Sequence, residues 1–166
     1  RDRNATDFLN CFIVIKNGNA VWDNESAETR TGFCVDLEMS ENVQKYLDAV
    51  RSQADGNELL IEQRVNFSNF IDAENAFGTG DAIIIGQSEI QVHDLKYGRG
   101  VKVDAENNEQ LKLYALGALS DFGMFGDFTH VRLVIHQPRL NHVSESVVSI
   151  EDLYDFAHRA KNTVQM

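Results

Sequence analysis

The chain has 166 residues, with 26 acidic and 15 basic side chains and a net charge of −11. Its length suits a single domain with a substantial core. The acidic balance argues against a general nucleic-acid coat or a membrane-surface protein, although an enzyme that acts on DNA needs only a local basic lining.

The first third of the chain carries few functional signals. An apolar run within 8–15, a turn at 16–19 and a second short run at 20–22 predict a small N-terminal hairpin. The region lacks the apolar stretch of a signal peptide, and no run in the sequence approaches membrane-spanning length. Cys11 and Cys34 are too few for a structural zinc or iron–sulfur site. We therefore expect free thiols, a cytoplasmic protein and no membrane partner.

A helix and a strand are expected next. Ser40 can cap a helix over 41–51, whose first turn contains Glu41. A turn at 55–57 then leads into a strand over 58–65, in which Glu62 is the one acid inside the apolar run that follows Glu58. Acids at a helix start are favoured by the helix dipole alone, so Glu41 has a structural explanation. A hydrogen-bonded edge position likewise explains Glu62.

The centre of the sequence predicts a β-hairpin. Apolar runs at 82–85 and 89–95 flank the turn signal Gly86-Gln87-Ser88. A four-residue loop over 86–89 would pair Ile85 with Ile90, and would therefore set the register of both strands. We expect the glycines at 78 and 80 to turn the backbone tightly into the first strand.

The same register places charged side chains together at one end of the hairpin. Asp81 falls opposite Asp94, with Cβ atoms about 5 Å apart, and Lys96 shares the face of Asp94. Paired carboxylates repel each other unless a cation lies between them, and oxygen ligands suit Mg²⁺ or Mn²⁺. A surface hairpin with solvated acids is the simpler alternative.

The last third alternates helices and strands. A helix over 107–119 would place Gln110 and Tyr114 on one face, because they lie four residues apart. A polar helix face with a half-buried tyrosine and no functional role would give the same sequence pattern. Strands at 131–137 and 143–149 and a final helix at 150–160 complete the expected order.

Three motifs carry a family resemblance when taken in order. They are GxxD at 78–81, DxK at 94–96 and QxxxY at 110–114. Together they resemble the PD-(D/E)XK nuclease superfamily in its RecB-like branch, which includes lambda-type exonucleases. Over residues 38–157 the chain is more closely similar to phage and prophage RecB-like nucleases.

The resemblance implies an α/β fold with a restriction-endonuclease-like core, in which helices flank a central mixed sheet. It implies one nuclease-like domain over 1–166, with 1–33 as a divergent hairpin region. The implied activity is metal-dependent hydrolysis of DNA, most simply by an exonuclease of phage-type recombination in the host cytoplasm. The implied residues are the metal ligands Asp81 and Asp94, with Glu41 as a further ligand, and the catalytic Lys96, Gln110 and Tyr114.

Cations near the acids are candidates for substrate binding. Arg99 and Lys102 follow Lys96 directly, and Arg139 could extend the lining, although each could be an ordinary solvated charge. The resemblance allows a homo-oligomer or a recombination partner protein. A function of another class also fits the acidic surface, namely a degenerate nuclease fold that binds proteins or mimics DNA.

Overall fold

The computed structural model describes residues 3–23 and 32–164, and the chain divides into two compact units, Arg1–Ala49 and Val50–Met166. None of the helices within the described ranges is both long and apolar enough to cross a membrane.

The first unit contains a small sheet of order β2-β1-β3. The strands β1 (Phe12–Lys16) and β2 (Asn19–Asp23) form the antiparallel hairpin that the sequence predicts. A 3₁₀ turn, η1 (Ala5–Phe8), precedes β1, and the short strand β3 (Phe33–Cys34) pairs with its other edge.

The helix α1 (Leu37–Ala54) carries the chain out of the first unit and is longer than predicted. The predicted cap is wrong, because Ser40 lies inside the helix and donates its hydroxyl to Leu37 O. The carboxylate of Asp36 accepts a hydrogen bond from Met39 N at 2.7 Å instead. This interaction satisfies a donor of the first turn.

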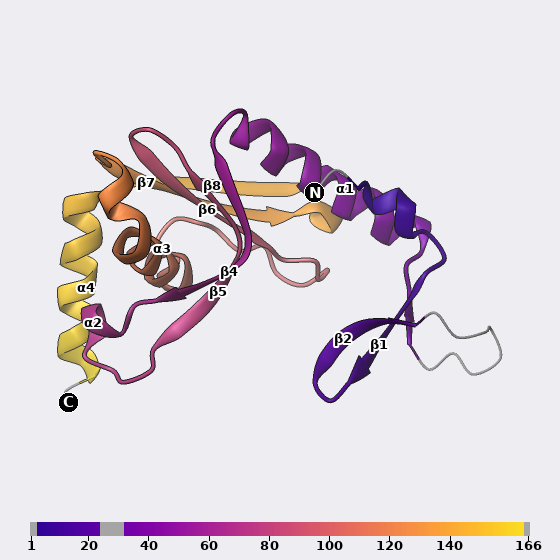
Figure 1. Ribbon diagram of the computed structural model, residues 1–166, viewed down its shortest axis with the longest axis horizontal. Coiled ribbons are helices and arrows are strands. Elements are labelled where there is room, and N and C mark those ends of the chain that lie inside the picture. Colours follow the sequence, from indigo (N-terminus) through magenta and orange to yellow (C-terminus); the bar gives the residue numbers. More distant parts are fainter. Residues whose placement is uncertain (1–2, 24–31, 165–166) are drawn as a thin grey trace. The chain divides into compact units, whose positions relative to one another are not determined.

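The second unit is built on a five-stranded sheet of order β4-β5-β6-β7-β8 (Figure 1). Its strands are β4 (Glu58–Asn66), β5 (Phe77–Ile85), β6 (Glu89–Leu95), β7 (His130–Gln137) and β8 (His142–Ser149). Only β6 and β7 pair in parallel among these neighbours. The fold is therefore mixed α/β, with a mixed sheet flanked by helices.

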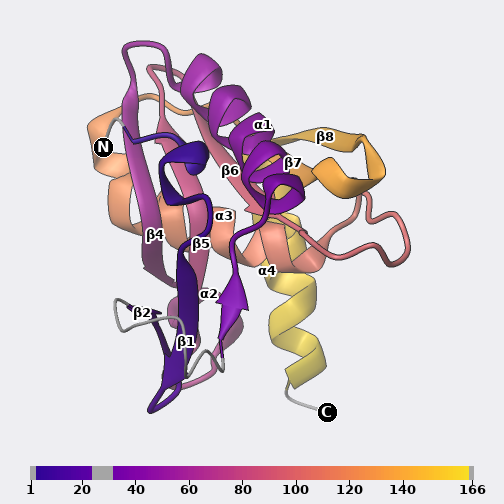
Figure 2. The same ribbon diagram turned by 90° about the vertical axis from the view of Figure 1, so that its right-hand side faces the viewer.

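Two helices cover one face of this sheet. The helices α3 (Glu109–Phe122) and α4 (Ile150–Val164) bury Leu111, Leu116 and Leu153 against the apolar side chains of the strands. Figure 2 shows α3 running across the back of β4 and β5. The shorter elements are α2 (Ser68–Ile71), η3 (Gly123–Phe125) and η4 (Pro138–Leu140).

The glycines before Asp81 have a different role from the predicted one. Gly78 and Gly80 lie inside β5 and form no tight turn. A Cβ on Gly78 would lie 2.1 Å from Cε1 of Tyr114, so only glycine leaves room for that ring. Gly117 similarly lets α3 approach β4, where a Cβ would lie 2.8 Å from Val65 Cβ. Close packing of α3 therefore explains glycine within a strand.

Candidate functional site

The β5–β6 hairpin has the predicted register. Ile83 pairs with Val92 and Ile85 with Ile90. The last pair of the ladder is Ala82 with His93, one residue before Asp81 and Asp94. Asp81 Oδ2 instead accepts a hydrogen bond of 2.7 Å from the backbone N–H of Leu95. The first carboxylate is thereby fixed to the end of β6.

Asp94 and Lys96 form the centre of the site. Asp94 is only 5% exposed, and it shares the face of Ile90 and Val92, which is the face covered by α3. Lys96 Nζ lies 3.1 Å from Asp94 Oδ1 and 2.9 Å from Oδ2. Oδ2 is buried, yet within the described residues it makes no hydrogen bond of acceptable geometry. A buried carboxylate oxygen with one ionic contact retains capacity for a further cation or donor.

The helix α3 adds the third motif to this centre. The side chain of Asn108 accepts from Leu111 N and caps the helix. In the first turn of α3, Gln110 Oε1 accepts a hydrogen bond from Lys96 Nζ at 3.3 Å, and its Nε2 donates to the Tyr114 hydroxyl at 2.9 Å. The prediction that Gln110 and Tyr114 share one helix face is confirmed. The lysine is thus held between a strand carboxylate and a helix amide.

The electrostatics of Asp81 differ from those of an ordinary surface acid. Burial raises its pKa, the hydrogen bond from Leu95 N–H lowers it, repulsion by Asp94 raises it and Lys96 lowers it. The net direction is upward, so the ionised form is disfavoured in the folded protein. A cation beside the two carboxylates would reverse this effect.

Glu62 is the residue whose position the sequence reveals least. Ile61 pairs with Ala82 and Gln63 with Gly80, so Glu62 lies opposite Asp81. Its φ of 50° is left-handed, which is rare for a non-glycine residue within a strand. Glu62 is exposed, but partial burial of its carboxyl and then repulsion by Asp81 raise its pKa.

The left-handed conformation of Glu62 changes which side chains of β4 face α3. Leu60 and Val65 both pack in the core on the α3 side, although they lie five positions apart in the sequence. Strict alternation would place them on opposite faces. Reversal at Glu62 therefore accounts for both contacts. No residue type here signals a left-handed conformation, so sequence reasoning could not detect it.

The remaining predicted residues lie at different places. Glu41 belongs to the first unit, where it is exposed on α1, and its role as a ligand stays a prediction. Arg99 and Lys102 are exposed in the loop between β6 and α3. Arg139 lies in η4, with its guanidinium 4.9 Å from the centre of the Tyr97 ring. Their roles in substrate binding likewise stay predictions.

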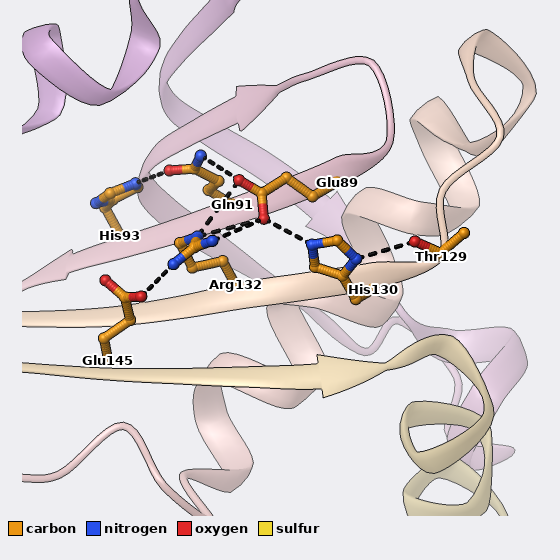
Figure 3. Close-up of polar contacts among 7 residues, drawn as sticks. All are labelled: Glu89, Gln91, His93, Thr129, His130, Arg132 and Glu145. Carbon is orange, nitrogen blue, oxygen red and sulfur yellow. Dashed lines mark hydrogen bonds and ion pairs between the residues drawn. The ribbon is translucent and has the colours of Figure 1, made fainter.

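A second polar cluster lies on the opposite face of the sheet (Figure 3). Glu89 accepts hydrogen bonds from Gln91 at 2.7 Å and from Arg132 at 3.3 Å, and pairs with His130 at 2.9 Å. Arg132 also forms an ion pair with Glu145. Burial acts to raise the pKa of Glu89, but the bonds and charge of Arg132, with the bonds of Gln91 and His130, bring it below its ordinary value. We call these five residues the Glu89 network.

The buried histidines His93 and His136 extend the Glu89 network. His93 Nδ1 and His136 Nε2 are 3.0 Å apart, and His93 Nε2 lies 3.0 Å from Gln91 Oε1. Burial, then the charges of His136 and Arg132, lower the pKa of His93 to about 3. His93 is therefore neutral at physiological pH.

Across residues 3–23 and 32–164, no three His, Cys, Asp or Glu side chains come together as a metal-binding group. Asp81 and Asp94 are thus a pair of carboxylates, and any further ligands to a cation would be waters, substrate oxygens or backbone carbonyls.

A comparison with known protein families identifies the family of this chain. The model of a family described as "Protein of unknown function (DUF2800)" matches residues 13–166, and the chain therefore belongs to the DUF2800 family.

Proposed function

We propose that this protein is a metal-dependent deoxyribonuclease of the PD-(D/E)XK type. The observation that carries the proposal is the continuous contact from Asp94 to Lys96, Gln110 and Tyr114, beside the anchored carboxylate of Asp81. Residues from three sequence motifs thus meet at one end of the β5–β6 hairpin. If the three motifs were unrelated surface residues that match the family by chance, their side chains would not need to contact one another.

The carboxylates fit Mg²⁺ or Mn²⁺. Asp81 and Asp94 would hold the ion, and the buried Asp94 Oδ2 without a hydrogen bond is the atom that best supports this assignment. When bound, such an ion polarises the scissile phosphate and lowers the pKa of water toward neutrality. The assignment of Glu41 as a further ligand stays a prediction from the sequence.

The chain's own groups would position the reactants. Lys96 Nζ donates toward the attacking water or a phosphate oxygen, where its charge stabilises the developing anion. Gln110 accepts a hydrogen bond from the ammonium, and the Tyr114 hydroxyl accepts one from the Gln110 amide and so orients it. In the reaction, the water oxygen bonds to phosphorus, the phosphorus–oxygen ester bond breaks, and a proton from water ends on the leaving oxygen.

The preferred form of this activity is an exonuclease that serves phage-type recombination, with DNA as substrate and a recombination protein or further copies of the chain as partners. Exonucleases and endonucleases share the same hydrolytic chemistry. They differ in how the surrounding chain admits a DNA end.

A second candidate is a degenerate nuclease fold that acts as an acidic protein-binding module or DNA mimic. The net charge of −11 favours it. The burial of Asp94 and its pairing with the partly exposed Lys96 argue against it, because a decoy needs carboxylates on its surface and has no use for a lysine held by Gln110.

The test is cleavage of linear and circular duplex DNA with Mg²⁺ or Mn²⁺ against EDTA. We expect metal-dependent cleavage of the linear form, and at least about a hundredfold loss of rate in Asp94→Ala and Lys96→Ala. A parent protein that is folded and cleaves neither form with either metal would remove the enzyme from consideration and favour the acidic binding module.

A further inference from the structure

The loop between β6 and α3 carries cations beside the proposed centre. It begins at Lys96 and contains Arg99 and Lys102, both exposed, in a chain with a large excess of acids. Between them Val101 is 86% exposed, which places it among the most exposed large apolar residues of the described ranges. The loop therefore presents its tip to solvent and to any ligand at the site.

One buried side chain holds this exposed loop from below. Gln137, at the end of β7, is 3% exposed. Its Oε1 accepts a hydrogen bond from Val103 N at 2.7 Å, and its Nε2 donates to Val101 O at 3.2 Å. The two bonds lie on either side of Lys102, so a single amide fixes the backbone that carries this cation.

Neighbouring residues support the same segment. His142 Nε2 lies 3.3 Å from Val103 O, and Ser144 Oγ accepts from Ala105 N at 2.9 Å. Both belong to β8, nearly forty positions further along the chain. Backbone groups of an exposed loop are ordinarily satisfied by water, so their capture by side chains from β7 and β8 indicates a loop held in one conformation.

Preformed loops reduce the cost of binding. Ordering the backbone of a residue costs about 1–2 kcal/mol, and a loop that is already ordered does not lose this free energy on binding. Phosphate contacts from lysine and arginine dominate the affinity of proteins for DNA. A fixed cationic loop beside Lys96 would therefore fit the phosphate backbone of a nucleic-acid strand.

We infer that Gln137 is a positioning residue for substrate binding, which holds the loop over 97–103 so that Arg99 and Lys102 contact the DNA backbone. The inference rests on the proposed function and extends it to a residue that does not touch the reacting atoms. Its simplest alternative is that Gln137 satisfies its own buried amide and the loop only connects β6 to α3.

The experiment compares Gln137→Met with Gln91→Met in the full chain. Gln91 is also a buried glutamine of the sheet, 6% exposed, but it bonds within the Glu89 network and not to the loop. Three quantities are measured: amide hydrogen exchange over 97–105, affinity for a short duplex in Ca²⁺ at several salt concentrations, and kcat and KM in Mg²⁺.

For Gln137→Met we expect faster exchange in the loop, about tenfold weaker duplex binding, and a salt dependence shallower by about one unit for each lost phosphate contact. We expect KM to rise and kcat at saturating DNA to stay within about twofold of the parent, because the metal centre is intact. Gln91→Met should keep the parent's loop exchange and salt dependence. Lys102→Gln should reduce the salt slope with no change in loop exchange, which tests the contact even if Gln137→Met does not fold.

Two results would overturn the inference. Unchanged loop exchange in folded Gln137→Met would mean that the amide does not hold the loop. Parent-like affinity and salt slope in Gln137→Met, or in Lys102→Gln, would mean that the loop does not contact the phosphates. Failure of the proposed function looks different, because the parent itself would then neither bind nor cleave the duplex.

Discussion

The two faces of the five-stranded sheet both carry charged residues, but in opposite electrostatic states. On one face, Arg132 bridges Glu89 and Glu145, and the pKa of Glu89 is lowered despite its burial. On the α3 face, Asp81 lies near Asp94, its pKa is raised, and Asp94 Oδ2 is buried without a hydrogen bond. Charges that are fully paired stabilise a fold, whereas a partly buried carboxyl with a raised pKa beside a second carboxylate indicates a candidate site for a ligand.

The largest stability effect is expected from breaking the Glu89 network. Arg132→Met removes the cation between two carboxylates, of which Glu89 is only 19% exposed. We expect a loss of about 2–3 kcal/mol in the free energy of unfolding, because hydrogen bonds to charged groups contribute about 1.5–3 kcal/mol. Urea denaturation would measure it. A loss below half a kcal/mol would mean that the network does not stabilise the sheet.

Packing at the α3 face gives the next effect. Gly78→Ala would place a methyl group 2.1 Å from Tyr114 Cε1. Overpacking of this kind costs about 1–3 kcal/mol, so we expect about 2 kcal/mol, together with reduced nuclease activity as Tyr114 and Gln110 move. Tyr114→Phe is the control that keeps the ring and removes only the bond to Gln110. A Gly78→Ala protein with the parent's stability and activity would contradict this account of the GxxD motif.

Relief of strain should change stability in the other direction. Glu62→Gly keeps the left-handed backbone at φ 50° without the steric cost of a side chain. The expected gain is about 1 kcal/mol, partly offset by the entropy of glycine in the unfolded chain. Thermal unfolding against Glu62→Ala, which retains the strain, isolates the backbone effect. Equal midpoints for the two variants would rule out strain at this position.

The smallest expected effect is on the pH dependence of stability, which should have opposite signs for the two faces of the sheet. The raised pKa of Asp81 means that its ionised form costs stability above that pKa, so Asp81→Asn should be more stable than the parent at pH 7, by about 0.5 kcal/mol. This gain should vanish below pH 3.8, the ordinary value for the group. The lowered pKa of Glu89 contributes stability above pH 4.5, lost as pH falls through the folded value.

Glu89→Gln should therefore be less stable than the parent at pH 7, and its deficit should shrink in acid. Unfolding free energies of both variants between pH 3 and 7 would check the opposite signs. Deviations of the same sign in the two variants would contradict the contrast between the faces.

Local patterns predicted the hairpin and the helix face well. The register of Ile83 with Val92 follows from alternation and loop length, and the proximity of Gln110 to Tyr114 follows from helical geometry. The Glu89 network could not be predicted, because Arg132 reaches Glu89 only through the parallel pairing of β6 with β7. That pairing depends on how α3 crosses the sheet, which periodicity does not encode.

The extent of β5 and the conformation of Glu62 also depend on long-range packing. Glycines at 78 and 80 indicate a turn when only neighbours are considered, but the ring of Tyr114 requires the first of them within a strand. The reversal at Glu62 satisfies the core contacts of Leu60 and Val65 with no local signal. Tertiary contacts override intrinsic preference at such positions.

The measurement that tests the central claim most directly is Mn²⁺ binding, followed by electron paramagnetic resonance, in the parent, Asp94→Asn and Glu145→Gln. Each variant neutralises one carboxylate, on opposite faces of the sheet. We predict that the parent and Glu145→Gln bind the ion equally, and that Asp94→Asn binds it at least about 10–100-fold more weakly. Equal affinity in all three proteins, or no binding by the folded parent, would contradict a metal centre at Asp81 and Asp94.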